Sequence, residues 1–188
     1  MSVSDEKSRL RRTLKEAGAA FLSATTSAQR EAFARDVFDQ IERSDAFRNA
    51  RTVLLYASLP DEVPTGSVLA RWSSSRQLVL PLVEGETLRL KRYSPEGVRP
   101  GYQGILEPLE SCPEVAPGEI DLAIVPARAY TREGARLGRG KGYYDRLLPL
   151  LDKAVKVGAA FPFQMVESLP VEEWDVRLDA VYSLSFLG

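Results

Sequence analysis

The sequence contains no histidine and a single cysteine, Cys112, among its 188 residues. Without histidine, Ser-His-Asp and Cys-His catalysis are excluded, and so is a zinc site built from cysteine and histidine side chains. One cysteine cannot form an internal disulfide, which suits a reducing compartment. If the chain is an enzyme, its chemistry has to come from carboxylates, Lys, Arg and Tyr, together with a hard cation such as magnesium. These groups suit phosphate chemistry, in which positioning and charge stabilisation carry most of the catalysis.

Long apolar runs and a large excess of one charge are also missing. No apolar run approaches the roughly 20 residues of a membrane span, and the N-terminus lacks the apolar core of a signal peptide. A net charge of −1 argues against general binding to nucleic acid or to a membrane surface. We therefore expect a cytoplasmic protein in which residues 1–188 form one domain that acts as a monomer, without nucleic-acid or membrane partners.

The most distinctive stretch that is present is 136–146, RLGRGKGYYDR. Its three glycines alternate with Arg139 and Lys141, so exposed main-chain amides and cations together make an anion-binding nest. A short apolar helix, limited by Pro149, follows the loop, and such a junction is a sound phosphate site. The spacing fits neither a P-loop nor a dinucleotide fingerprint, which leaves a flexible basic surface turn as the alternative. Asp145 could hold a metal against bound phosphates.

Apolar periodicity predicts the order of helices and strands along the chain. Helices are expected at residues 4–23, 26–46 and 65–75, and strands at 51–57, 77–83, 87–93, 121–127, 153–161 and 178–184. Residues 94–119 predict an extended surface loop, with the acidic tract 107–121 as solvated surface. This alternation implies an α/β fold, a three-layer α/β/α sandwich with a largely parallel central sheet, Rossmann-like. The site should lie beyond the carboxyl ends of the strands, where loops 58–65, 127–143 and 162–175 begin.

The central stretch, preceded by its strand and by VPARAYTREGA, resembles the signature of the 5-formyltetrahydrofolate cyclo-ligase family, also called 5,10-methenyltetrahydrofolate synthetase. The resemblance extends over almost the whole chain. Its other parts are Lys7-x-x-Leu10-Arg11, Y-x-S-L-x-D-E-V-x-T from Tyr56 to Thr65, G-I-L-E-P at 104–108, Gln164, and the segment 169–179.

What the resemblance implies is an ATP- and Mg²⁺-dependent cyclisation of 5-formyltetrahydrofolate to 5,10-methenyltetrahydrofolate. Phosphorylation of the formyl oxygen would drive the ring closure, with release of ADP and phosphate. The implied catalytic residues are Lys7, Arg139 and Lys141. The implied ATP-binding residues are Lys7, Arg11, Arg136, Leu137, Gly138, Arg139, Gly140, Lys141, Gly142, Tyr143 and Tyr144. The implied folate-binding residues are Glu62, Arg139, Gly140, Lys141, Gly142 and Tyr143. The implied magnesium ligands are Asp145 and Asp175.

Some positions depart from the family pattern, and other functions stay open. Trp174 stands where the family often has histidine, Pro64 replaces an acid, and Tyr102 or Gln103 falls where the family lines its folate pocket, a core or hinge role being the alternative. A solvated face is the alternative for the basic side of the first helix. A phosphosugar isomerase or acyl-CoA transferase on a similar sheet and a non-catalytic folate or nucleotide binder are the alternative functions.

Overall fold

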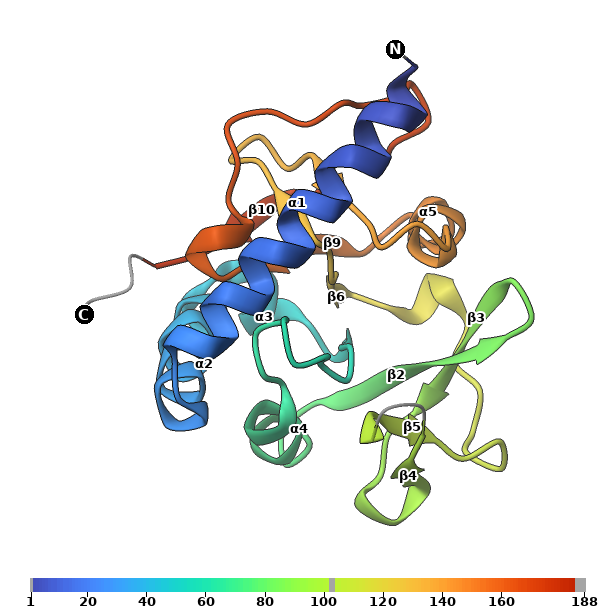
Figure 1. Ribbon diagram of the computed structural model, residues 1–188. Coiled ribbons are helices and arrows are strands. Elements are labelled where there is room, and N and C mark those ends of the chain that lie inside the picture. The colour runs from blue at the N-terminus through green and yellow to red at the C-terminus, as the bar shows by residue number, and fades with distance from the viewer. Residues whose placement is uncertain (1, 102–103, 185–188) are drawn as a thin grey trace.

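The computed structural model describes residues 2–101 and 104–184, and Tyr102 and Gln103 lie outside this range. A six-stranded sheet forms the centre, in the order β10-β9-β6-β1-β2-β3 (Figure 1). Its strands are β1 (Thr52–Leu54), β2 (Gln77–Glu84), β3 (Thr87–Arg92), β6 (Leu122–Ile124), β9 (Val155–Ala159) and β10 (Ala180–Tyr182). All neighbours are parallel except β2 and β3, which form an antiparallel hairpin. The largely parallel sheet is as the sequence predicts.

Helices cover both faces of the sheet. They are α1 (Val3–Ala24), α2 (Ser27–Arg43), α3 (Asp45–Asn49), α4 (Gly66–Trp72) and α5 (Tyr143–Leu147). Alternate residues of a strand face opposite layers, so Val53 packs in the core formed with α2, α3 and α4. Its neighbour Leu54 packs in the second core, with Leu147 of α5. Strands buried on both faces explain the continuous apolar runs in the sequence, and the predicted three-layer α/β sandwich is confirmed.

Local hydrogen bonds set the ends of the first helices. Thr26 and Gln29 form a reciprocal capping box at the start of α2, because each side chain bonds the other residue's main-chain amide. The helix expected to run on to residue 46 ends instead at Arg43. The Ser44 hydroxyl donates to the Ile41 carbonyl and accepts from the Phe47 amide, which starts α3 as a separate helix.

Residues 94–119 are more ordered than the predicted surface loop. They contain the antiparallel strands β4 (Val98–Pro100) and β5 (Leu106–Pro108) and short 3₁₀ helices at Pro95–Gly97 and Pro117–Glu119. The acidic tract is attached to β3 rather than simply solvated. Arg89 of that strand forms ion pairs with Glu110 and Glu114, and the buried Lys91 ammonium donates to the Glu110 and Cys112 carbonyls.

The segment before the glycine loop folds as a small hairpin, which periodicity did not predict. Strands β7 (Ala129–Tyr130) and β8 (Arg136–Leu137) pair in antiparallel fashion. Gly134 turns the chain with a φ of +83° and accepts a hydrogen bond from the Leu178 amide. The helix after the loop is short, as Pro149 predicts: α5 ends at Leu147 and a 3₁₀ turn, Leu148–Leu150, follows. None of the helices in the described ranges is both long and apolar enough to span a bilayer.

Candidate functional site

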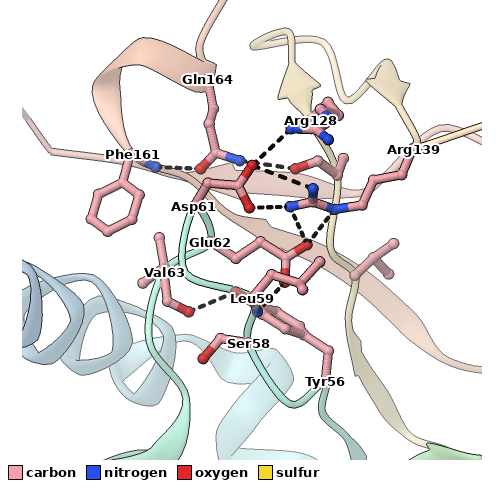
Figure 2. A network of polar contacts seen from close by, with 12 residues as sticks. Tyr56, Ser58, Leu59, Asp61, Glu62, Val63, Arg128, Arg139, Phe161 and Gln164 are labelled. Carbon is pink, nitrogen blue, oxygen red and sulfur yellow. Dashed lines mark hydrogen bonds and ion pairs between the residues drawn. The ribbon is translucent and has the colours of Figure 1, made fainter. Parts of the chain in front are cut away.

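The strand order reverses at β1, which has β2 on one side and β6 on the other. The loops that leave the carboxyl ends of β1 and β6 therefore diverge and open a crevice, the usual ligand site of such sheets. Figure 2 shows side chains from both loops meeting there: Asp61 and Glu62 after β1, and Arg128 and Arg139 after β6. Gln164, after β9, joins the same region by donating to the Ala127 carbonyl and accepting from the Phe161 amide.

The loop after β1 is braced by its own polar residues. The Thr65 hydroxyl donates to the Tyr56 carbonyl over 2.7 Å, and the Tyr56 hydroxyl donates to the Val63 carbonyl. Ser58 and Thr65 exchange two further bonds between side chain and main chain. The conspicuous Tyr, Ser and Thr of this segment thus hold the loop in shape, and the two acidic residues between them project into the crevice.

Four charged side chains form a network across the crevice (Figure 2). Arg139 Nη2 lies 2.6 Å from Asp61 Oδ1 and 2.9 Å from Glu62 Oε1, while Arg139 Nε donates to Glu62 over 3.0 Å. Arg128 Nη1 donates to the other oxygen of Asp61 over 2.7 Å. Two carboxylates and two guanidinium groups balance one another, and Arg139 is fixed from two sides.

Glu62 is the most deeply buried charge of this network, with 5% of its surface exposed. Burial raises the pKa of the Glu62 carboxyl, and the neighbouring Arg139 charge and the Leu59 amide oppose this rise. Because the Arg139 charge and the Leu59 amide offset only part of the effect of burial on this carboxylate, it can accept further hydrogen bonds from a ligand.

Two adjoining cavities meet at this network. The larger, about 710 Å³, has mostly apolar walls formed by α1, the β2–β3 hairpin and β5. The smaller, about 80 Å³, lies against the glycine loop. Six residues line both cavities: Glu62, Pro126, Arg139, Lys141, Tyr143 and Tyr144. The arrangement offers room for an organic ligand beside a compact cationic, glycine-lined compartment.

The small cavity is bordered by two buried donors that have no hydrogen-bond partner among the described residues. They are the Tyr144 hydroxyl and the Arg136 Nε–H group. A buried polar group is normally hydrogen-bonded, and an exception calls for an explanation such as a ligand. Two unsatisfied donors beside Lys141 favour an anion or another oxygen-rich group as that ligand.

The N-terminal helix contacts the glycine loop, although 127 positions in the sequence separate Arg11 from Gly138. Arg11 Nε donates to the Gly138 carbonyl over 2.9 Å. One turn earlier, Lys7 Nζ lies 2.8 Å from Glu172 and 2.7 Å from Asp175 of the C-terminal loop. Burial opposes the charge of Lys7, but the two carboxylates outweigh this effect and raise its pKa.

The two predicted metal ligands both interact with the charge of Arg136. Asp145 forms an ion pair with the Arg136 guanidinium. Burial would raise the pKa of Asp175, but the hydrogen bonds from Lys7 and the Glu172 amide lower it, and the Arg136 charge adds to this effect. Among the described residues no group of three or more Asp, Glu or Cys side chains could enclose a metal ion. A cation here would have to bring most of its ligands with it.

The structure brings most of the predicted site residues to the cavity walls and leaves others apart. Those that line a cavity are Glu62, Arg136, Gly138, Arg139, Lys141, Gly142, Tyr143, Tyr144 and Asp145. Lys7, Arg11 and Asp175 line neither cavity, and neither does Gly140 of the loop itself. Leu137 packs with Leu14 in a small core, so its side chain is not available to a ligand. Any ligand contact of Leu137 would therefore come from its main chain.

Three residues at the site were not predicted from the sequence: Asp61, Arg128 and Lys15. Asp61 was not assigned a role, although its neighbour Glu62 was. Two adjacent acids in a short loop after a strand could have indicated that both belong to the site. Arg128 belongs to the local basic excess between residues 128 and 146. Lys15 follows Lys7 and Arg11 at helical spacing and lines the larger cavity. Because Lys7, Arg11 and Lys15 are four residues apart in turn, these three cations lie on one face of α1.

Fold and site together define an α/β protein that holds a larger, apolar-walled cavity and a small cationic one side by side at its topological switch point. Residues 3–183 match the 5-formyltetrahydrofolate cyclo-ligase family. The chain therefore belongs to this family of enzymes, in agreement with the resemblance in its sequence.

Individual relatives agree with this assignment. The 5-formyltetrahydrofolate cyclo-ligase of Haemophilus influenzae is 34% identical over 139 residues, 70% of this chain and 74% of the relative. That of Escherichia coli is 34% identical over 144 residues, 72% of this chain and 79% of the relative. The solved 5,10-methenyltetrahydrofolate synthetase of Aquifex aeolicus is 34% identical, with a TM-score of 0.80 over 93% of this chain and 89% of that one.

Proposed function

We propose that the protein catalyses the ATP- and Mg²⁺-dependent cyclisation of 5-formyltetrahydrofolate to 5,10-methenyltetrahydrofolate, with release of ADP and phosphate. The observation that carries the proposal is the junction of the two cavities at Glu62, Arg139 and Tyr144. A reaction between a bulky organic substrate and a phosphate group needs such a junction. Family membership supports the substrate, because the relatives are named for it.

The larger cavity suits a folate. Its apolar walls, which include Val83, Leu88 and Leu106, match the flat ring systems of the substrate. Glu62 lies where the cavities meet, and its carboxylate can accept paired donors from the 2-amino-pyrimidinone edge of the pterin. Asp61 keeps Arg139 in place when the Glu62 oxygens turn toward the substrate, because it contacts the same guanidinium group independently.

The nucleotide phosphates would bind between the glycine loop and the first turns of α1. Lys141 and the main-chain amides of the loop supply positive charge at the small cavity, and Arg11 is already attached to the loop at Gly138. Lys7 would exchange its carboxylate partners for phosphate oxygens. A triphosphate carries enough negative charge to compete with Glu172 and Asp175 for one ammonium group.

Asp145 and Asp175 fit a magnesium ion that arrives with the nucleotide. The hydrogen bonds of Asp145 use only Oδ1 and those of Asp175 only Oδ2, so each carboxylate keeps an oxygen for a cation. Mg²⁺ is usually held by one or two carboxylates together with substrate phosphates, which matches this sparse donor set. When bound, the ion would neutralise charge on the phosphates.

The chemistry then needs positioning and charge stabilisation. The formyl oxygen attacks the γ-phosphorus, and the bond from that phosphorus to ADP breaks. The N10 nitrogen attacks the activated carbon and releases its proton, and the carbon–oxygen bond breaks as phosphate leaves. Arg139 and Lys141 line both cavities, so their charges can stabilise the phosphoryl oxygens throughout. No step needs a histidine.

We further propose that residues 1–188 act as one domain and as a monomer in the cytoplasm. The family match across residues 3–183 supports the single domain. Light scattering during size-exclusion chromatography would measure the oligomeric state.

The test is to incubate the protein with 5-formyltetrahydrofolate and MgATP and to follow methenyl absorbance. The proposal requires product with ATP and none without it. An isomerase or acyl-CoA transferase would need no ATP, and a non-catalytic binder would give ligand binding without product. Product formation that needs no ATP, or ligand binding without product, would refute the cyclo-ligase activity.

A further inference from the structure

Tyr144 presents the clearest unexplained feature of the site. Its hydroxyl is buried, has no hydrogen-bond partner among the described residues, and belongs to a side chain that lines both cavities. An unsatisfied buried hydroxyl destabilises a folded protein. The nearby buried tyrosines differ: Tyr56 donates to the Val63 carbonyl and Tyr130 to the Val125 carbonyl.

A tyrosine hydroxyl can donate one hydrogen bond. Tyr144 and Glu62 line both cavities and Arg136 lines the small one, so this donor lies where the compartment expected to hold a phosphate joins the larger cavity.

We propose that the Tyr144 hydroxyl is a catalytic hydrogen-bond donor to the oxygen that links the formyl carbon to phosphorus. This inference rests on the proposed cyclo-ligase function and adds a role to it. The linking oxygen is the one atom shared by the folate and the transferred phosphate, so it has to lie where the two cavities join.

The donor acts when phosphate departs. N10 has by then attacked the formyl carbon and released its proton to solvent. The carbon–oxygen bond breaks, its electron pair goes to the linking oxygen, and that oxygen leaves with the phosphate. Tyr144 keeps its own proton and stabilises the growing negative charge by its hydrogen bond. Preorganised donors of this kind are strongest where charge develops, in a site that excludes water.

The test compares Tyr144→Phe with wild type and with Tyr130→Phe. Both variants remove one buried hydroxyl and nothing else, but the Tyr130 hydroxyl is satisfied and lines neither cavity. We expect Tyr144→Phe to lower kcat about tenfold or more, with both KM values changing less than about threefold. Its melting temperature without ligands should equal or exceed that of wild type, because the unsatisfied group is gone. Tyr130→Phe should keep kcat and lose thermal stability.

A rapid-quench experiment tests the step. In Tyr144→Phe, ADP should form in a burst before the methenyl product, because phosphate departure has become slow.

Three results would overturn the inference. They are a kcat of Tyr144→Phe within twofold of wild type, a loss of thermal stability like that of Tyr130→Phe, and the absence of an ADP burst alongside a lowered kcat. An inactive wild type would overturn the proposed function and this inference together. An active wild type with an equally active variant overturns only the role of Tyr144.

Discussion

Two carboxylates, Asp61 and Glu62, hold Arg139 in place, but only Asp61 is free to do so throughout the proposed reaction. Glu62 has to serve the substrate, whereas Asp61 contacts Arg139 and Arg128 and has no other role in the proposed reaction. Without the Asp61 charge, both guanidinium groups would depend on Glu62 alone. Arg139 would move toward that carboxylate and compete with the pterin for it.

Replacement of Asp61 should therefore reduce activity through Arg139. For Asp61→Asn we expect kcat/KM for 5-formyltetrahydrofolate to fall about tenfold or more, because the variant removes one partner of a half-buried charge pair. The matched control is Asp39→Asn. Asp39 and Glu42 hold Arg71 in the same way, at 2.9 and 2.7 Å, but line neither cavity. Equal activity of the two variants in the methenyl assay would contradict this role.

The pH dependence of folate binding should report Glu62. Burial raises the pKa of this carboxyl above its ordinary 4.5, so a larger fraction is protonated, and unable to accept two donors, at mildly acidic pH. Hence kcat/KM for the folate, measured at saturating MgATP, should fall on acidification through a limb that lies above pH 4.5.

The pH profile of kcat/KM for Glu62→Gln shows whether Glu62 is the group that titrates in this limb. The variant cannot titrate there, so its kcat/KM should be low and free of the Glu62 limb. The same limb in both proteins would place the titrating group on the nucleotide or the substrate. A histidine cannot contribute, since the chain has none.

At the residue scale, the sequence predicted the groups that carry a distinctive pattern. The alternating glycines and cations of the loop predicted an anion site, with a flexible basic turn as the alternative, and Glu62 was predicted from the family resemblance. Asp61 could not be assigned a role, because its importance depends on two arginines far along the chain. The sequence also cannot tell that Leu137 packs in a core, or that the Tyr144 hydroxyl has no hydrogen-bond partner in the described part of the chain. Those properties arise only from packing.

At the scale of elements, the structure joins the two ends of the described chain. The first turns of α1 are tied to the C-terminal loop by Lys7, and to the glycine loop by Arg11. In the sequence, Trp174 lies between Glu172 and Asp175, the two residues whose carboxylates hold Lys7. Trp174 is 71% exposed, whereas the chain's other tryptophan, Trp72, is 1% exposed. Trp174 is thus a natural reporter of events at Lys7.

Nucleotide binding should change the fluorescence of Trp174. If phosphates draw Lys7 away from Glu172 and Asp175, the loop that carries Trp174 changes its contacts, and its emission should change saturably with MgATP. Trp72 should not respond, because it is packed in the core of α2, α3 and α4. The change should vanish in Trp174→Phe and require far more MgATP in Lys7→Met. An unaltered titration of Lys7→Met would mean that phosphates do not reach this lysine.

Elements were predicted best where the hydrophobic period is long and clear. The helix predicted at 4–23 differs from α1 by one residue at each end, and the strand predicted at 77–83 differs from β2 by one residue at its C-terminal end. The small strands at 98–100, 106–108, 129–130 and 136–137 were missed, because two or three residues are too few to show a period. Their partners are set by tertiary contacts, such as the bond from the Leu178 amide to Gly134.

At the scale of the whole molecule, the larger cavity collects walls from distant parts of the chain. Lys15 of α1, Glu62 after β1, Val83 of β2, Leu106 of β5 and Tyr143 of α5 all line it. A ligand in this cavity therefore contacts several of these elements at once. Ligand binding should stabilise the molecule as a unit, since the unfolded chain has no such cavity.

Thermal unfolding should reveal this coupling between ligand and fold. At 100 times its dissociation constant, a ligand adds about 2.7 kcal/mol to the unfolding free energy. For a chain of this length, that corresponds to a rise in Tm of about 5–10 °C, at about 2–4 °C per kcal/mol. We expect such rises for 5-formyltetrahydrofolate and, separately, for a non-hydrolysable MgATP analogue. Glu62→Gln should lose most of the folate shift and keep the nucleotide shift, because Glu62 is expected to contact the pterin and not the phosphates. Loss of both shifts together would instead mean that the variant has disturbed the whole crevice, and that the two compartments are not separate binding sites.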